Sequence, residues 1–326
     1  MKTEILTCLK EAEGYISGQE LCECLGVSRT AVWKVIRQLQ EEGYEIEAVR
    51  NRGYRLVESG DVLSEAELKS VLKTSWAGRN IKYCEEVDST NNEARRLAEQ
   101  GAPHGTLVVA ELQTAGKGRR GRFWTSPPGT GIWMSMVLRP DFAPEHASML
   151  TLIAAMAVET GVREMTGLDC RIKWPNDIVL EGKKICGILT EMSTEEDVIR
   201  HVVVGIGINV NIREFPEEIG KTATSLAIVS GKELRRAVLV DAVMRAWEHY
   251  YDCYRKTLDM SALKDAYNAR LVNCGREVKV LAPKGEYCGI SHGINDTGEL
   301  LVELENGEIR EVMSGEVSVR GIYGYV

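Results

Sequence analysis

The sequence has 326 residues, 44% hydrophobic and 27% charged, with a formal net charge of −8. These values predict two or three globular domains and exclude a disordered chain, and the negative charge argues against nucleic-acid binding over the whole surface. No apolar stretch approaches the roughly 18 residues of a membrane span and residues 1–4 do not begin a signal peptide, so we expect a cytoplasmic protein with no membrane anchor.

The first sixty residues predict short helices followed by a hairpin. Ile5, Leu6 and Leu9 form one apolar helical face, and a second helix over residues 19–25 ends at Gly26. A third helix begins after Ser28, a residue type that caps helix N-termini. Two strands, at 46–49 and 54–57, flank an arginine-bearing turn at 51–53.

The third helix has the pattern of a DNA-recognition helix. Val32, Ile36 and Leu39 fall on one face, which leaves polar and basic side chains pointing outward. Residues 29–55 contain six basic residues against four acidic ones inside an acidic protein. A winged helix-turn-helix is therefore predicted, although these helices could instead merely stabilise a neighbouring domain. The residues expected to contact DNA are Ser28, Arg29, Thr30, Trp33, Lys34, Arg37 and Arg52.

A polar link at 58–61 and a predicted capping box, Ser64 to Glu67, place the first domain boundary near residue 62. Beyond it, strands mix with helices that follow Thr90, Pro144 and Lys232, the last reaching about Arg255. The fold class is α+β, with strands joined by hairpins. The expected strands are 81–87, 106–112, 132–138, 171–174, 184–191 and 202–209.

After Asn273 the pattern changes to short strands separated by glycine turns, which predicts a small β-barrel. These strands are 278–281, 287–292, 300–304 and 308–312. The predicted domains are therefore 1–62, 63–272 and 273–326.

The nine cysteines are an odd number, scattered from Cys8 to Cys288. They lack the density and even count of a disulfide framework, so we expect reduced thiols, most of them in the core. The five histidines have no metal-ligand spacing, and no protein-held metal is expected.

Residues 113–122 contain G-x-G-x-x-G after a predicted strand. A dinucleotide fold needs a helix directly after this motif, and Pro127 and Pro128 exclude that helix. We expect instead a loop that wraps anionic groups such as phosphates, the alternative being a solvated basic loop. Its cations are Lys117, Arg119, Arg120 and Arg122.

Three further segments carry polar residues at element ends. Alternation along residues 171–174 places Lys173 opposite its apolar neighbours, and the following Asn176 and Asp177 are suited to orient a nucleotide or its Mg²⁺. Lys184 starts an apolar strand and is predicted to point into a cleft, unless it is only a snorkelling edge lysine. Thr90 and Glu93 form a predicted capping box, which puts a helix N-terminus near a ligand head group.

In this order and spacing, these segments resemble the biotin-protein ligases, specifically the bifunctional class that also represses biotin synthesis. The resemblance covers essentially the whole chain. Its motifs are the glycine-arginine loop at 116–122, Lys-Trp-Pro-Asn-Asp at 173–177, Gly-x-Gly-Ile-Asn at 205–209 and Gly-Glu-x-Ser-x-Arg at 315–320. The family implies a winged helix-turn-helix, a mixed-sheet ligase domain like those of class II synthetases, and a C-terminal SH3-like β-barrel.

The resemblance also implies site residues. Contacts to biotin or biotinyl-adenylate are implied for Ser89, Thr90, Asn91, Gln113, Lys117, Gly118, Arg119 and Lys184. Positions near the nucleotide are implied for Arg122, Lys173, Asn176, Lys279 and Arg320, and Asn209 is implied as a further cofactor-binding residue. Lys117 stands where arginine is common, so it keeps the charge and loses the bidentate fork. Some members stack an aromatic side chain on adenine after the Gly-Ile-Asn strand, and none is found in residues 222–230.

The implied chemistry has two steps, adenylation of biotin by Mg·ATP and transfer to a lysine of biotin carboxyl carrier protein. Neither step needs an enzyme nucleophile, and catalysis by positioning and by Lys184, Arg119 and Lys173 is expected. Biotinyl-5'-AMP is expected to serve as corepressor of a homodimer bound to operator DNA. The rivals are a lipoate ligase, which lacks this loop, and a repressor that only senses a metabolite.

Overall fold

The computed structural model describes residues 1–282, 285–314, 318–321 and 325, and it divides into two compact units. The first unit comprises Met1–Lys73 with Arg235–Asp241, and the second comprises Thr74–Leu234 with Ala242–Val326. Among the described residues, no helix combines the length and apolarity needed to cross a membrane.

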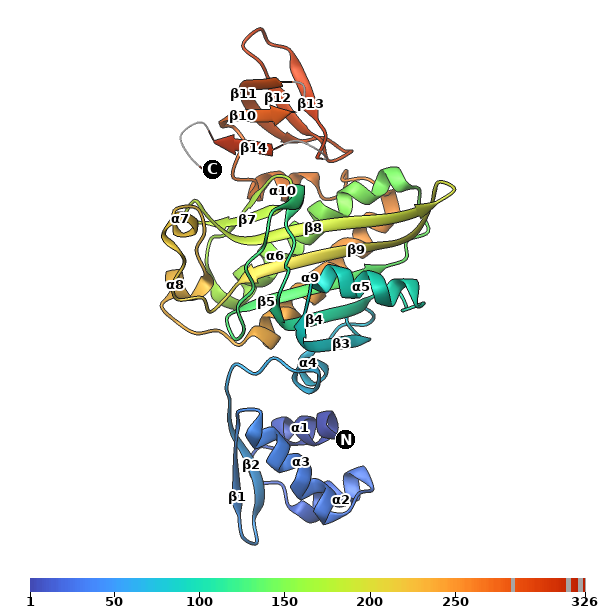
Figure 1. Cartoon of the computed structure of the whole chain (residues 1–326), viewed down its shortest axis with the longest axis vertical. Coiled ribbons are helices and arrows are strands. Elements are labelled where there is room, and N and C mark those ends of the chain that lie inside the picture. Colours follow the sequence, from blue (N-terminus) through green and yellow to red (C-terminus); the bar gives the residue numbers. More distant parts are fainter. Residues whose placement is uncertain (283–284, 315–317, 322–324, 326) are drawn as a thin grey trace. The chain divides into compact units, whose positions relative to one another are not determined.

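The first unit is the predicted winged helix-turn-helix (Figure 1). Its helices bury one apolar face each, and the face of the third, Val32, Ile36 and Leu39, is at most 2% exposed. Ser28 Oγ accepts a hydrogen bond from Ala31 N at 3.3 Å and so caps that helix as predicted. The elements are α1 (Lys2–Glu11), α2 (Gly18–Leu25), α3 (Arg29–Glu41), β1 (Tyr44–Val49), β2 (Gly53–Ser59) and α4 (Glu65–Val71).

The wing turn depends on a glycine. Gly53 has φ 109°, and a Cβ there would lie 2.1 Å from Ile16 O. The close approach lets Ile16 and Tyr54 exchange backbone hydrogen bonds of 2.9 and 2.8 Å. The wing is thereby tied to the segment before α2.

The predicted Ser64–Glu67 capping box forms only in part. Ser64 Oγ accepts from Glu67 N at 3.2 Å. The Glu67 carboxylate, 3% exposed, instead turns inward to Tyr44 Oη at 2.8 Å and Lys10 Nζ at 2.7 Å. Burial lowers the pKa of Lys10, and a charged partner offsets part of that cost. Helix α4 therefore packs with the N-terminal helices.

The second unit is built on a seven-stranded sheet of order β3-β4-β5-β9-β8-β7-β6. Only β3 and β4 pair in parallel, so the sheet is mixed as predicted. The strands are β3 (Ile81–Val87), β4 (Thr106–Gln113), β5 (Gly131–Leu138), β6 (Arg171–Lys173), β7 (Asp177–Leu180), β8 (Lys183–Glu195) and β9 (Val198–Asn209).

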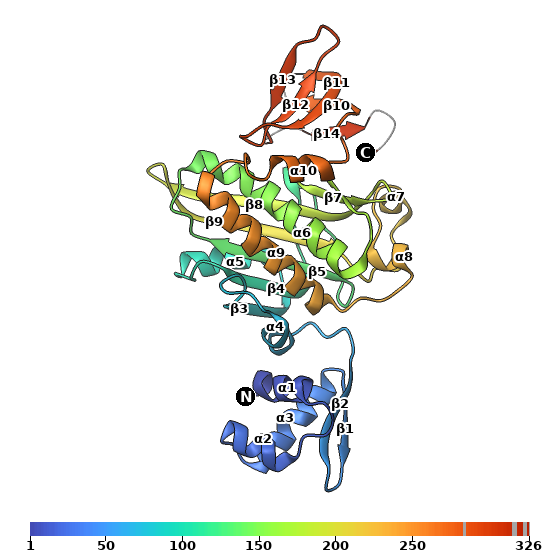
Figure 2. The ribbon, with the colours of Figure 1, turned by 180° about the vertical axis from the view of Figure 1, so that it is seen from behind.

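Helices cover both faces of this sheet. Figures 1 and 2 show α5 on one face and α6 with α9 on the other. The short elements β7, α7, α8 and α10 were not predicted, because four to seven residues carry too little periodicity. The helices are α5 (Thr90–Glu99), α6 (Leu150–Thr166), α7 (Glu217–Gly220), α8 (Leu226–Ser230), α9 (Arg236–Thr257) and α10 (Lys264–Arg270), with 3-10 turns η1 (Arg119–Gly121) and η2 (Pro144–Met149).

The C-terminal part is an antiparallel sheet of order β13-β12-β11-β10-β14. Its last strand returns beside its first, the arrangement predicted as an SH3-like barrel. Val278, Val280, Leu300 and Val302 are fully buried in it. The strands are β10 (Glu277–Ala282), β11 (Gly285–Ile294), β12 (Leu300–Glu303), β13 (Ile309–Val312) and β14 (Ser318–Gly321).

All nine cysteines are described, and none is paired in a disulfide. The expectation that most lie in the core is wrong, because only Cys170 and Cys186 are buried. Cys24, Cys274 and Cys288 are exposed. A cysteine is small enough to be accommodated at either place, so its type alone does not report burial.

Candidate functional site

The loop between β4 and β5 lies over a pair of glycines in the sheet. Gly187 on β8 faces Gly207 on β9 in the strand register. A Cβ at either position would come within 2.8 or 2.7 Å of the Trp124 ring. The two glycines therefore make the space that seats this indole, and no helix follows the G-x-G-x-x-G segment, as predicted.

The basic loop holds one arginine inward. Arg119 Nη1 donates to Asn176 Oδ1 at 2.8 Å, and Nη2 donates to Ser314 O at 2.6 Å. Burial lowers the pKa of Arg119, although a guanidinium stays protonated at neutral pH. The neighbouring Arg120 and Arg122 are exposed. Arg119 is thus the loop cation that is best oriented for a bound anion.

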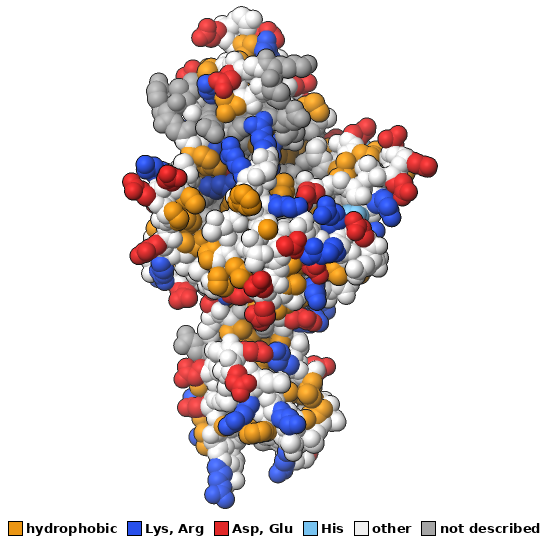
Figure 3. Space-filling view, in the orientation of Figure 1, with side chains coloured by type: hydrophobic (Ala, Val, Ile, Leu, Met, Phe, Trp, Pro, Cys, Tyr) orange, Lys and Arg blue, Asp and Glu red, His pale blue; other side chains and the backbone are white. Residues whose placement is uncertain are grey.

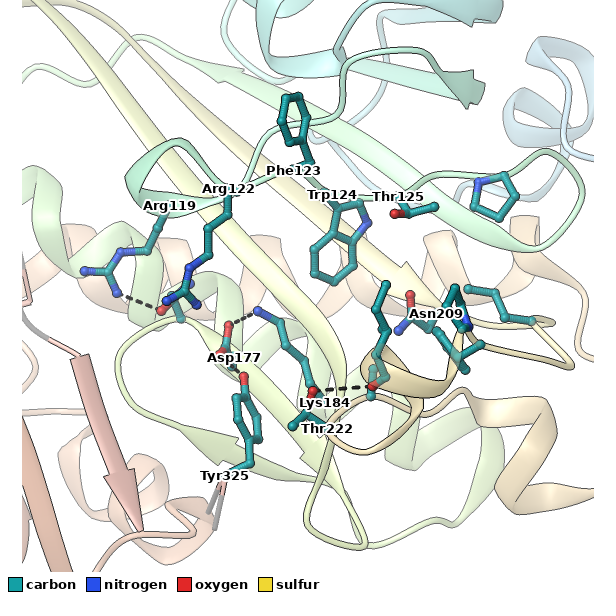
Figure 4. A pocket seen from close by; sticks show the side chains of 18 of the residues that line it. Arg119, Arg122, Phe123, Trp124, Thr125, Asp177, Lys184, Asn209, Thr222 and Tyr325 are labelled. Atoms are coloured by element: carbon teal, nitrogen blue, oxygen red, sulfur yellow. Dashed lines mark hydrogen bonds and ion pairs between the residues drawn. The ribbon is translucent and has the colours of Figure 1, made fainter. Parts of the chain in front are cut away.

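Lys184 and Asp177 form an ion pair in the same region. Their side chains lie 2.6 Å apart across β7 and β8, and they are 23% and 15% exposed. Tyr325 Oη donates to the other Asp177 oxygen at 2.5 Å. The Lys184 ammonium also lies 5.2 Å from the Trp124 ring centroid. Lys184 thus lines a cavity and is not a fully exposed edge lysine (Figure 4).

Two cavities meet at these residues. The larger, about 490 Å³, falls in the size range of small-molecule sites. The smaller, about 50 Å³, is below the size range of organic-ligand sites. Both are lined by Gly118, Arg119, Trp124, Asn176 and Lys184.

The smaller cavity brings together all eight residues for which biotin contacts were implied. They are Ser89, Thr90, Asn91, Gln113, Lys117, Gly118, Arg119 and Lys184. The larger cavity is lined by Arg122 and Asn176, implied near the nucleotide, and by Asn209, implied as a cofactor-binding residue. These sets come from segments up to about a hundred residues apart in the chain, so only the fold assembles them.

The start of α5 is not capped as predicted. Ser89 is the N-cap residue and its side chain makes no capping bond, while Thr90 N donates to Gln113 Oε1 at 2.8 Å. Glu93 pairs with Arg96 at 2.8 Å and does not reach back to the helix start. The Thr90–Glu93 capping box is therefore wrong, because a side chain from β4 supplies the acceptor.

Three implied nucleotide residues lie elsewhere or are only partly described. Lys173 is 4% exposed, and its ammonium lies 3.3 Å from the Tyr325 ring centroid, outside the linings of both cavities. Lys279 on β10 pairs with Glu286 and lines neither cavity. Arg320 is on β14, but its side chain lies outside the described residues, as does the segment 315–317.

Several lining residues were missed from the sequence. Phe215 and Ile219 lie between β9 and α8 and contribute apolar surface to the larger cavity, together with Phe123 and Tyr325. Phe215 precedes residues 222–230, the segment in which no stacking aromatic residue is found. The sequence signal that could have identified Phe215 is an aromatic residue a few positions after Asn209, where the Gly-Ile-Asn strand ends.

The residues expected to contact DNA lie on the surface of the first unit. All side chains predicted to point outward from α3 are exposed. Trp33 is 48% exposed, and the Arg37 guanidinium lies 4.9 Å from its ring centroid. On the wing, Arg52 lies 4.7 Å from the Tyr15 ring centroid. Figure 3 shows Lys and Arg side chains, in blue, on this unit.

Three family models match the chain in sequence order. A model described as HTH domain matches residues 2–55, the Biotin/lipoate A/B protein ligase family matches 83–209, and the Biotin protein ligase C terminal domain matches 274–320.

Full-length relatives are similar over nearly the whole chain. The Bifunctional ligase/repressor BirA of Bacillus spizizenii is 44% identical over 307 residues, 94% of each chain. The protein of the same name from Escherichia coli is 31% identical, over 93% of this chain and 92% of that one. Among solved structures, the biotin protein ligase from Aquifex aeolicus in complex with biotin and ATP has a TM-score of 0.67 and 36% identity, covering 74% of this chain and 99% of that chain.

Proposed function

This chain belongs to the bifunctional biotin-protein ligase/repressor family, and we propose that it attaches biotin to carrier proteins and controls biotin genes. It is an ATP-dependent ligase that forms biotinyl-5'-AMP and transfers biotin to a lysine of biotin carboxyl carrier protein. It is also a biotin-responsive transcriptional repressor. The supporting observation is the meeting of two cavities at Arg119, Asn176 and Lys184, where the two halves of an acyl-adenylate would be joined.

The first step needs charge stabilisation more than a protein nucleophile. A biotin carboxylate oxygen attacks the α-phosphorus of ATP, and pyrophosphate leaves with the bonding electron pair. Arg119 and Lys184 are proposed to hold the oxygens on which negative charge develops. Lys184 would exchange its Asp177 partner for the ligand oxygen, so that the ion pair keeps the ammonium in place before substrate arrives.

The second step consumes the mixed anhydride. The neutral amine of the carrier lysine attacks the carbonyl carbon, AMP leaves, and the amine proton passes to solvent. Mg²⁺ is proposed to enter with the ATP phosphates, since Mg²⁺ commonly uses phosphate oxygens and only one or two carboxylates. Asp177 is the carboxylate in the larger cavity that best fits such a role, once Lys184 has released it.

We propose the following assignments. Ser89, Thr90, Asn91, Gln113, Lys117, Gly118, Arg119 and Lys184 contact biotin or its adenylate, while Arg122, Asn176 and Asn209 contact the nucleotide. Roles for Lys173, Lys279 and Arg320 remain predictions from the family resemblance. The functional domains are 1–62, 63–272 and 273–326, although the first compact unit extends to Lys73.

The regulatory assignments are also proposals. Ser28, Arg29, Thr30, Trp33, Lys34, Arg37 and Arg52 read operator DNA of biotin genes. One recognition helix spans about one half-site, so a homodimer on a palindrome is proposed, with biotinyl-5'-AMP as corepressor. The protein works in the cytoplasm, where ATP, carrier and DNA are all present.

The ligase activity is tested directly by supplying biotin, ATP and Mg²⁺ and then adding a biotin carboxyl carrier domain. We expect biotin on the carrier lysine, detected by mass. Lipoate in place of biotin is the matched control, and modification by lipoate alone would overturn the assignment in favour of a lipoate ligase.

A further inference from the structure

A chain of polar side chains lies behind the smaller cavity and ends on β8 at Glu191. Asn91 Nδ2 donates to Glu191 Oε2 at 2.7 Å and to Leu189 O at 3.2 Å. A carboxylate and a carbonyl can only accept, so the amide of Asn91 has one allowed orientation. Its carbonyl oxygen must therefore face the opposite way, toward Ser135 on β5.

The orientation of Asn91 determines the direction of the hydrogen bonds of Ser135. Its Oγ lies 2.6 Å from Asn91 Oδ1 and 2.8 Å from Thr90 Oγ1. A hydroxyl has one proton, and Asn91 Oδ1 can only accept it, so Ser135 donates to Asn91 and accepts from Thr90. All three side chains are at most 5% exposed, and in such surroundings an unmatched pair of acceptors is costly.

The strand register builds the space for this chain. Ser135, Gly205 and Leu189 lie in one row across β5, β9 and β8. A Cβ at Gly205 would lie 2.0 Å from Asn91 Oδ1. The glycine therefore admits the amide that links Glu191 to Ser135.

These hydrogen-bond directions determine which groups Thr90 and Gln113 offer in the wall of the smaller cavity. Thr90 Oγ1 also lies 3.1 Å from Gln113 Oε1, but that oxygen already accepts from Thr90 N at 2.8 Å. The shorter contact with Ser135 has no other proton, because Ser135 gives its own to Asn91, so it takes the Thr90 proton. Thr90 therefore offers its remaining lone pairs to a ligand. Gln113 Nε2 gives one proton to Ser126 Oγ at 2.7 Å and has a second one to donate. The wall thus presents one acceptor beside one donor, the complement of the N–H and C=O of a cyclic urea.

We propose that Glu191, Asn91 and Ser135 form a positioning relay that fixes Thr90 as acceptor and Gln113 as donor toward the ureido head of biotin. The inference rests on the proposed ligase function and deepens it. Glu191 and Ser135 act through their neighbours and need not touch the ligand.

The test measures KM for biotin and for ATP by biotin-dependent exchange of pyrophosphate into ATP. Ser135→Ala and Asn91→Asp should each raise the KM for biotin by about tenfold, the equivalent of one lost hydrogen bond, with little change in the KM for ATP. The double variant Asn91→Asp/Glu191→Gln exchanges amide and carboxylate and restores the direction of the relay, so it should recover most of the loss of Asn91→Asp. Glu195→Gln, an exposed carboxylate farther along β8, is the matched control and should behave as wild type.

Wild-type KM for biotin in both single variants would overturn the relay, and so would a double variant no better than Asn91→Asp. If the wild-type chain itself shows no biotin-dependent exchange, the proposed function fails, and the relay fails with it. The wild-type measurement therefore separates the two failures.

Discussion

The ammonium of Lys184 and the carboxylate of Asp177 lie 2.6 Å apart at the junction of the two cavities. Both side chains are largely shielded from solvent, so each charge has the other as its close partner. An anionic ligand that reaches Lys184 must compete with Asp177. The pair therefore links substrate binding to the release of a carboxylate in the nucleotide cavity.

Lys184→Gln should slow adenylate formation by about 10- to 100-fold, because it removes a charged hydrogen bond worth about 1.5 to 3 kcal/mol in the transition state. Single-turnover formation of biotinyl-5'-AMP measures the effect. Lys183→Gln is the control, since Lys183 is exposed and bonds only Gly220 O among the described contacts. Adenylation by Lys184→Gln at the wild-type rate would show that Lys184 is only an edge lysine with no role in adenylate formation.

Arg119→Ala should lower adenylate synthesis and speed adenylate release, each by about 10-fold or more, because one guanidinium contact is lost from the phosphate. Arg119→Lys should be intermediate, since it keeps the charge without the fork. Release is followed by chasing preformed adenylate with unlabelled ligand. An unchanged release rate in Arg119→Ala contradicts the assignment.

Stability should fall at mildly acidic pH because of His104. Burial lowers the pKa of His104, and its Nδ1 accepts from Arg139 N at 3.1 Å, which requires the neutral ring. In the unfolded chain His104 takes up a proton near the ordinary histidine pKa of about 6.5. Its contribution to the free energy of unfolding is therefore fully present above that pH and is lost as the pH falls through the lower pKa of the folded state. Urea midpoints at pH 7.5 and 5 should differ less in His104→Gln. If the urea midpoint changes with pH equally in the wild type and in His104→Gln, His104 is not the source of the change. His201, whose pKa is also lowered by burial, is then the other candidate.

Arg236→Ala should destabilise the first unit by about 3 kcal/mol or more, because it leaves Asp61 without its buried charged partner. The two side chains are 3% and 9% exposed, with Nε to Oδ2 at 2.6 Å. Trp33 is the one tryptophan of that unit, so the part of the urea-induced fluorescence change that is lost in a Trp33→Phe background reports the unit within the full chain. Lys69→Ala breaks an exposed pair with Glu65 on α4, within the same unit, and should cost less than about 1 kcal/mol. Equal effects of the two variants would contradict the prediction.

Biotin with ATP should promote self-association and tighten operator binding. The basic loop is expected to order on the adenylate, and by linkage a ligand that favours the dimer is itself bound more tightly by the dimer. Sedimentation and operator binding are measured with and without biotin plus ATP. Identical self-association and identical operator affinity in both conditions would contradict the proposed role of biotinyl-5'-AMP as corepressor.

Sequence periodicity and local chemistry were enough for the longer elements and their order, but not for the short elements β7, α7, α8 and α10. The faces of α1 and α3 follow from apolar spacing, and Pro127 and Pro128 excluded a helix after the glycine loop. Turn residues and alternation marked the long strands and the C-terminal sheet. These features depend on residues within one or two turns of each other, so they can be read along the chain.

Tertiary structure alone decided which side chains meet. Glu67 turns inward to Lys10, Thr90 is capped by Gln113, and Asp177 pairs with Lys184 only because β7 and β8 form a hairpin in one register. Such pairings join residues that are distant in sequence, and a capping or edge position looks the same locally whichever partner it takes. The physical reason is that hydrogen-bond and charge partners follow from strand register and packing, which no local pattern encodes.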